Sequence, residues 1–156
     1  MIPKEFFVTS GKATSSVSEL NAFDLALKTA GIAHCNLVSV SSVLPPECKE
    51  RKWRKLPAGS IVHAVVARMD GDEGTTIGAG IAWAWEKKKE YGIVAEAHGH
   101  MDRKALKETL AWKIKEMAKI RGIKIGAIKF RIEALRVPID NHGCVISTLV
   151  YCPLTC

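Results

Sequence analysis

Apolar residues recur at every second position along much of this chain, and at helical spacing in only two segments. Because alternate side chains of a strand point to opposite faces of a sheet, a period of two predicts half-buried strands. The expected strands span residues 36–43, 61–69, 75–85, 92–98, 128–134 and 144–151. The last of these is almost entirely apolar, which is typical of a central strand. Glycines within residues 70–74 suit a hairpin loop between the second and third strands.

The two segments with the helical pattern differ in length. A short helix is expected over residues 21–30, with Asn21 as its N-cap and Gly31 as the residue that ends it. A longer helix is expected from an N-cap at Asp102 to a stop near Gly122. Strands outnumber helices and do not alternate with them, so we expect an α+β fold with largely antiparallel pairing.

The length of 156 residues fits one domain, 1–156, because domains usually hold about 100–200 residues. Hydrophobic residues make up 47% of the chain and charged residues 25%, a composition that excludes general disorder. No apolar run reaches the roughly 18 residues that span a bilayer, and the apolar core of a signal peptide is absent from the first residues. A cytoplasmic location without a membrane partner is therefore expected.

Five cysteines are present, an odd number that favours free thiols over a disulfide framework. Cys152 and Cys156 are neighbours in sequence, but no Cys/His pair at metal-ligand spacing accompanies them, so a frayed tail is expected there. His98 and His100 would share a strand face without an evident third ligand. No metal site is predicted.

Positive charge is the other marked property, with a formal net charge of +7. Part of it lies in residues 49–55, where Trp53 stands among lysines and arginines, as in some sites for single-stranded nucleic acid. The same cluster also fits a solvated loop, and no RNA-binding signature surrounds it. The loop is the favoured interpretation, and a non-enzymatic nucleic-acid-binding module stays the alternative from a different class.

The serine pair Ser41-Ser42 is the most unusual motif, because it ends a β-branched strand just before two prolines. Adjacent serines at a strand end commonly satisfy only backbone groups. Residues 20–24, 30–32, 36–47, 55–59 and 116–119, however, resemble the pyruvoyl-dependent arginine decarboxylases. The resemblance extends from about residue 8 to about residue 151 and is most specific around the serine pair.

The resemblance implies a proenzyme that makes its own cofactor. The Oγ of Ser42 would attack the carbonyl of Ser41, and β-elimination of the resulting ester would leave a dehydroalanine that hydrolyses to a pyruvoyl group. The products would be a β chain of residues 1–41 and an α chain of residues 42–156. Asn36 would stabilise the oxyanion of the acyl shift. With period two it would share a strand face with Ser42, although capping of the turn after the first helix would explain Asn36 equally well.

The resemblance also implies roles in turnover. The pyruvoyl group would form a Schiff base with L-arginine and accept electrons as carbon dioxide leaves, which yields agmatine. Glu96 would then protonate the carbon, and its apolar flanks favour burial of the protonated acid; an outward-facing strand glutamate is the other interpretation. Asp24 would bind the substrate guanidinium, although a carboxylate near a helix N-terminus is also stabilising by itself. Leu27 and Ser41 would line the substrate pocket.

The family fold implied is a layered α/β/β/α sandwich, assembled as a homotrimer of processed αβ protomers with active sites between them. Leu25 departs from the family pattern, because a small residue is expected after the key aspartate. Decarboxylation of another amino acid is therefore an alternative. A relative that folds and trimerises without catalysis is a further one.

Overall fold

The computed structural model describes residues 1–153, which form two β-sheets and two helices. The first sheet has the strand order β2 (Asn36–Ser39), β5 (Ile61–Gly71), β9 (His142–Tyr151), β1 (Glu5–Ser15) and β4 (Lys49–Glu50). The second has the order β3 (Val43–Leu44), β7 (Gly92–Gly99), β6 (Thr76–Trp85) and β8 (Lys129–Arg136). The helices are α1 (Glu19–Thr29) and α2 (Arg103–Ile120).

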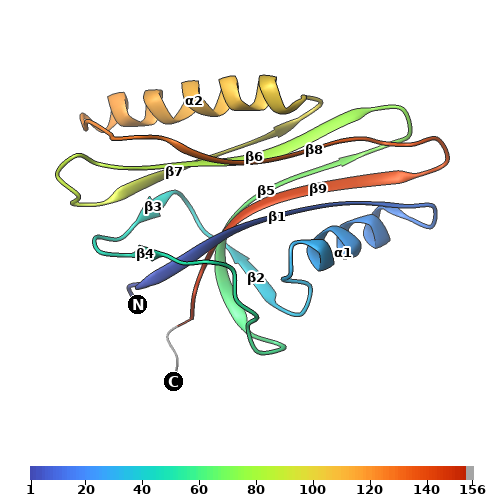
Figure 1. Cartoon of the computed structure of the whole chain (residues 1–156), viewed down its shortest axis with the longest axis horizontal. Helices are drawn as coiled ribbons and strands as arrows, with labels where there is room; N and C mark the ends of the chain where they lie inside the picture. Colours follow the sequence, from blue (N-terminus) through green and yellow to red (C-terminus); the bar gives the residue numbers. More distant parts are fainter. Residues whose placement is uncertain (154–156) are drawn as a thin grey trace.

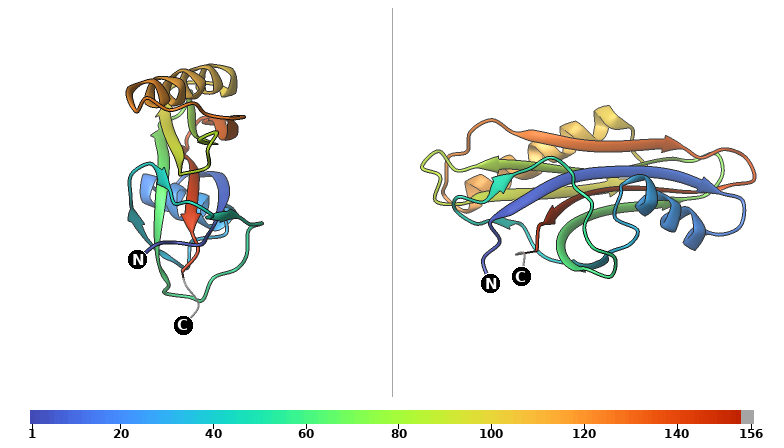
Figure 2. Two further views of the ribbon diagram at one scale, coloured as in Figure 1. Left: turned by 90° about the vertical axis from the view of Figure 1, so that its left-hand side faces the viewer. Right: turned by 60° about the horizontal axis from the view of Figure 1, so that its bottom comes forward.

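These elements lie in four layers. The two sheets stack face to face, α1 covers the outer face of the first sheet, and α2 covers the outer face of the second (Figure 1). The side view in Figure 2 shows α2 at one extreme of the stack. Strand pairs are antiparallel except for β1 with β4 and β2 with β5. The predicted α+β fold and its α/β/β/α layering are confirmed.

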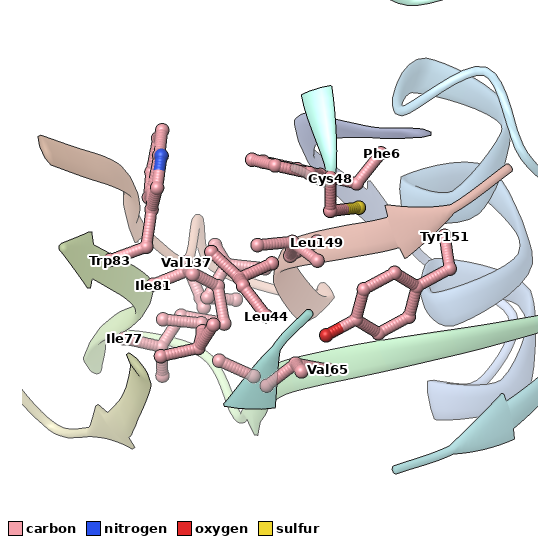
Figure 3. Close-up of a cluster of buried hydrophobic side chains, with 14 residues drawn as sticks. Phe6, Leu44, Cys48, Val65, Ile77, Ile81, Trp83, Val137, Leu149 and Tyr151 are labelled. Carbon is pink, nitrogen blue, oxygen red and sulfur yellow. The ribbon is translucent and has the colours of Figure 1, made fainter. Parts of the chain in front are cut away.

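Each interface between layers has its own apolar cluster. The cluster between the sheets includes Leu44, Val65, Ile81 and Leu149, all at most 2% exposed (Figure 3). Alanines of α1 pack on the first sheet, and the buried leucines of α2 pack on the second. As predicted, β9 is a central strand, and its residues from Gly143 to Tyr151 are all buried.

The structure corrects several local predictions. The first helix begins two residues early, because Ser18 rather than Asn21 is its N-cap, and the Ser18 hydroxyl accepts a hydrogen bond from the Asn21 backbone N–H. Strand β1 was not predicted from the sequence. Its apolar and polar residues alternate only weakly, because the adjacent residues Phe6 and Phe7 are both buried. Phe6 packs in the cluster between the sheets, and Phe7 packs in the cluster under α1.

Two predicted strand connections are also wrong. Residues 36–43 do not form one strand, because the chain leaves the first sheet after Ser39 and joins the second at Val43. Residues 70–74 do not close a hairpin, because β5 and β6 belong to different sheets. In both places the sequence pattern shows a strand on each side but carries no information about which sheet each strand joins.

The thiols at Cys35, Cys48, Cys144 and Cys152 are free, as predicted. Burial raises the pKa of the Cys144 thiol to about 12 and that of the Cys48 thiol to about 11. The frayed tail expected at Cys152 and Cys156 is wrong for Cys152, which is 5% exposed and whose backbone N–H donates to the Glu5 carbonyl over 2.9 Å. Cys156 lies outside the described residues. Within residues 1–153, no cluster of His, Cys, Asp and Glu side chains could hold a metal ion, and no helix is long and apolar enough to cross a membrane.

Candidate active site

The segment between β2 and β3 crosses from the edge of one sheet to the edge of the other (Figure 1). Ser41 and Ser42 lie in this segment. On one side, the Val40 N–H donates to the Ala64 carbonyl of the first sheet over 3.0 Å. On the other, the Ser42 carbonyl accepts from the Val94 N–H of the second sheet over 3.0 Å. Within residues 1–153, no hydrogen bond engages the backbone of Ser41. Ser41 is therefore a link without backbone hydrogen bonds between two anchored ends, Val40 and Ser42.

Ser42 and Glu96 line the same cleft, of about 300 Å³, between the exposed edge of β7 and helix α2. Val43 pairs with Ile93, and the hydrogen bond from Val94 extends this register to Ser42. Glu96 lies two residues beyond Val94 on the same face of β7, and such diagonal neighbours are about 7–8 Å apart. The structure thus brings together the two residues that the sequence predicted as the cofactor source and the proton donor.

The expected burial of Glu96 is wrong for the single chain, because this side chain is exposed. Its flanks Ala95 and Ala97 are buried under α2, whereas Glu96 points to the other face and lies beyond the end of β3. Strand β3 is only two residues long and leaves this part of the β7 edge uncovered. Ala95 and Ala97 therefore do not bury Glu96, although they flank it in the sequence.

Helix α2 contributes a cation to this cleft. The Nζ of Lys113 donates to the backbone carbonyl of Glu96 over 3.2 Å. Because the Val94 N–H points out toward β3, the Glu96 carbonyl two residues later also points to the outer edge of β7. Lys113 thus satisfies an edge carbonyl that has no strand partner. Sequence reasoning missed this contact, because no spacing rule relates Lys113 to a strand residue 17 positions earlier.

Ser41 lines a second pocket, which shares no lining residue with the cleft of Ser42 and Glu96. This pocket, of about 480 Å³, has a mostly apolar lining that includes Val40, Val43, Ile61 and Tyr151. Several of these aliphatic side chains are exposed, among them Ile61 at 66%. Ser41 therefore faces an open apolar surface, whereas Ser42 faces the cleft that holds Glu96.

Asn36 is not brought to Ser42 within one chain. It begins β2, its backbone pairs with β5, and its amide Nδ2 donates to the Gly59 carbonyl over 3.1 Å. The predicted shared strand face with Ser42 is wrong, because β2 ends at Ser39. Extended backbone from Asn36 to Val40 already covers about 13 Å. The alternative, a cap on the turn after the first helix, is also not what the structure shows.

Asp24 and Leu27 lie on α1, on the outer face of the first sheet. Asp24 is exposed, and Leu27 packs partly buried against the cluster under α1. Neither residue lines the cleft of Ser42 or the pocket of Ser41. Since α1 and α2 cover opposite outer faces (Figure 2), one chain does not bring Asp24 and Glu96 into one pocket.

The basic segment 49–55 is largely tied into the fold. Arg51 and Arg54 form ion pairs with Glu5, at 2.8 Å and 3.4 Å. The Nε1 of Trp53 donates to the Gly31 carbonyl over 3.3 Å. Gly31 has a φ of +77°, and a side chain at this position would collide with the Trp53 ring. Trp53 therefore packs against the end of α1.

Comparison with known proteins identifies the family. The chain matches the model of the family described as pyruvoyl-dependent arginine decarboxylase over residues 5–155. The chain belongs to this family. Among its relatives, a pyruvoyl-dependent arginine decarboxylase of Methanopyrus kandleri is 34% identical, and the match covers 82% of this chain and 83% of the relative.

Two further relatives give the same result. The pyruvoyl-dependent arginine decarboxylase 2 of Archaeoglobus fulgidus is 41% identical, with 80% of this chain and 82% of the relative covered. The pyruvoyl-dependent arginine decarboxylase of Methanocaldococcus jannaschii is 33% identical, with 94% and 88% covered. Membership in a pyruvoyl-dependent family implies a covalent pyruvoyl group, which confirms the cofactor predicted from the sequence.

The residues of this chain fit such a group. A pyruvoyl group made from Ser42 would keep the Ser42 carbonyl, whose hydrogen bond from the Val94 N–H holds it on β7. Ser42 is half-buried and lines the cleft that Glu96 also lines, and a substrate would reach it from there. The crossing segment therefore offers a restrained carbonyl at the border of a cleft.

Proposed function

We propose that this chain is a self-processing arginine decarboxylase that converts L-arginine to agmatine and carbon dioxide. The observation that carries the proposal is the cleft shared by Ser42 and Glu96, in a chain of the pyruvoyl-dependent arginine decarboxylase family. The cofactor would derive from Ser42, and Glu96 would act on the substrate bound beside it.

Processing would begin when the Ser42 Oγ attacks the Ser41 carbonyl carbon and loses its proton. The peptide bond to the Ser42 nitrogen would break, which leaves Ser41 esterified to the Ser42 oxygen. Loss of the Ser42 Cα proton would expel the Ser41 carboxylate, and water would replace the nitrogen, released as ammonia, with the ketone oxygen. The unrestrained backbone of Ser41 supports this proposal, since the acyl group must move while both flanks stay anchored.

The two new ends would stay in separate sheets. The end at Ser41 is carried by β2, which pairs with β5, whereas the end at residue 42 is carried by β3, which pairs with β7. Residues 1–41 also include β1, which pairs along its length with β9. Because strand pairing crosses between the two pieces, the cleaved chain would remain one folded protomer.

In turnover, the pyruvoyl group supplies an electrophilic carbonyl that accepts electrons as carbon dioxide leaves. Glu96 would donate the proton to the substrate carbon that has lost its carboxylate. Lys113 would hold the backbone carbonyl of Glu96 through its hydrogen bond and so support the placement of Glu96. Ser41, next to Ser42 in the chain, would also contact the substrate.

Asp24 would bind the guanidinium group from a neighbouring copy of the chain. Asp24 is exposed on α1 and does not line the cleft beside α2, which supports a site shared between protomers. The exposed apolar surface around Ser41 supports contact with another copy as well. We propose the homotrimer on these grounds, with Leu27 behind Asp24 and with Asn36 acting in processing. Polyamine synthesis and a cytoplasmic location stay predictions.

The first test replaces the proposed cofactor source. Ser42→Ala removes the nucleophilic oxygen, so the variant should stay as one chain and release no carbon dioxide from arginine. Ser39→Ala is the matched control, because Ser39 is an exposed serine three residues upstream. Denaturing gel electrophoresis and a carbon dioxide assay give the readouts. Decarboxylation by the Ser42→Ala protein would disprove the assignment.

The second test separates processing from turnover. Glu96→Gln keeps the shape of the side chain but removes the acid, so the chain should be cleaved normally. Its kcat should fall by about 10²–10⁴-fold, the usual contribution of a general acid. Cleavage is followed by mass spectrometry and kcat by carbon dioxide release. A Glu96→Gln chain that is never cleaved would place Glu96 in processing instead.

The third test concerns the substrate. Asp24→Asn should raise the KM for arginine by about 10–100-fold, because hydrogen bonds to charged groups contribute about 1.5–3 kcal/mol. Glu19→Gln, on the first turn of the same helix, is the control and should leave the KM unchanged. Steady-state kinetics in the assembled protein measure both values. An unchanged KM in Asp24→Asn would exclude this carboxylate from guanidinium binding and favour another substrate.

A further inference from the structure

Tyr151 makes a direct contact with the segment that follows the serine pair. Its hydroxyl donates a hydrogen bond to the backbone carbonyl of Val43 over 2.6 Å. Tyr151 lies at the end of β9 in the first sheet, and Val43 begins β3 in the second. Figure 3 shows the Tyr151 ring reaching into the cluster between the sheets, toward Leu44. The bond therefore ties the second sheet's edge strand to the opposite sheet, one residue after Ser42.

The hydrogen bond from Tyr151 to the Val43 carbonyl is expected to be stable. Tyr151 is 7% exposed, so its ring position is fixed by packing. Burial, with a smaller contribution from Cys48, raises the pKa of the Tyr151 hydroxyl to about 12. The group therefore remains a protonated donor throughout the neutral range. A buried hydroxyl that lost its acceptor would carry the cost of an unpaired polar group, which keeps the bond formed.

After cleavage at Ser41–Ser42, this hydrogen bond would anchor a new chain end. Residue 42 would become the start of a chain, and Val43 would be the second residue of that chain. Chain ends fray unless they are tied down, and the backbone here offers the pairing of Val43 and Leu44 with β7 and the hydrogen bond from the Val94 N–H to the Ser42 carbonyl. Backbone bonds hold this end to β7 alone. The Tyr151 hydroxyl is a side-chain anchor that approaches it from the other sheet.

We propose that Tyr151 is a positioning residue that holds the cofactor-bearing end of the cleaved chain in line with Glu96. The inference rests on the proposed function for its effect on turnover. A displacement of about 1 Å between reacting groups can cost on the order of 10²-fold in rate, so a frayed end at residue 42 would slow the reaction. Substrate binding through Asp24 would be unaffected, because Tyr151 belongs to the cluster between the sheets, whereas α1 packs in a different cluster on the outer face of the first sheet.

The experiment compares Tyr151→Phe with Tyr91→Phe in the assembled, full-length protein. Both changes remove one hydroxyl and keep the ring. Tyr91 directly precedes β7, and within residues 1–153 its hydroxyl makes no hydrogen bond, so Tyr91→Phe is a matched control. Cleavage is measured by mass spectrometry, kcat and KM by carbon dioxide release from arginine, and local opening by amide hydrogen exchange in residues 43–48.

Tyr151→Phe should still be cleaved, with an unchanged KM and a kcat roughly five- to tenfold lower, the effect of one lost hydrogen bond. Exchange in residues 43–48 should accelerate by a similar factor, and Tyr91→Phe should match the unaltered protein in every readout. Faster exchange with an unchanged kcat would overturn the role in turnover, and unchanged exchange would overturn the anchor. An inactive unaltered protein would contradict the proposed function instead, so the two failures are distinguishable.

Discussion

The stacking of two sheets determines how the backbone of the serine pair is held. Because β2 and β3 are edge strands of different sheets, the few residues between them must cross the space that separates the layers. Ladder hydrogen bonds hold the segment up to Val40 and again from the Ser42 carbonyl onward, so the Ser41 backbone is left without partners among the described residues. A peptide that is anchored on both sides and free in the middle can rearrange without unfolding its surroundings.

In the same arrangement, Ser41 and Ser42 line two different pockets. The Ser42 side faces α2 and the β7 edge, where Glu96 and Lys113 lie, whereas the Ser41 side faces an apolar pocket toward β5 and β9. Glu96 is exposed in the single chain. Closure of this cleft by a second copy would exclude water and strengthen the electrostatic interactions of the site. Asp24 on the far side of the fold fits the same explanation, since a neighbouring copy would supply it.

The hydrophobic period was sufficient to predict most strands, the long helix and the central place of β9. It did not predict the division of residues 36–43 between two sheets, because Ser39 and Val43 each look like strand residues in isolation. The serine pair and Glu96 could be identified from the family pattern, but Lys113 and Tyr151 could not. Their contacts with the Glu96 and Val43 carbonyls depend on how layers pack, which no local spacing records.

The central claim is that the chain cuts itself between Ser41 and Ser42 to make its cofactor. A denaturing intact-mass spectrum of freshly purified protein tests it most directly. We predict two masses in place of the 17.0 kDa chain, one for residues 1–41 and one for residues 42–156 with a pyruvoyl group at its start. A single mass of 17.0 kDa after prolonged incubation would contradict the account and leave the family fold without its catalytic group.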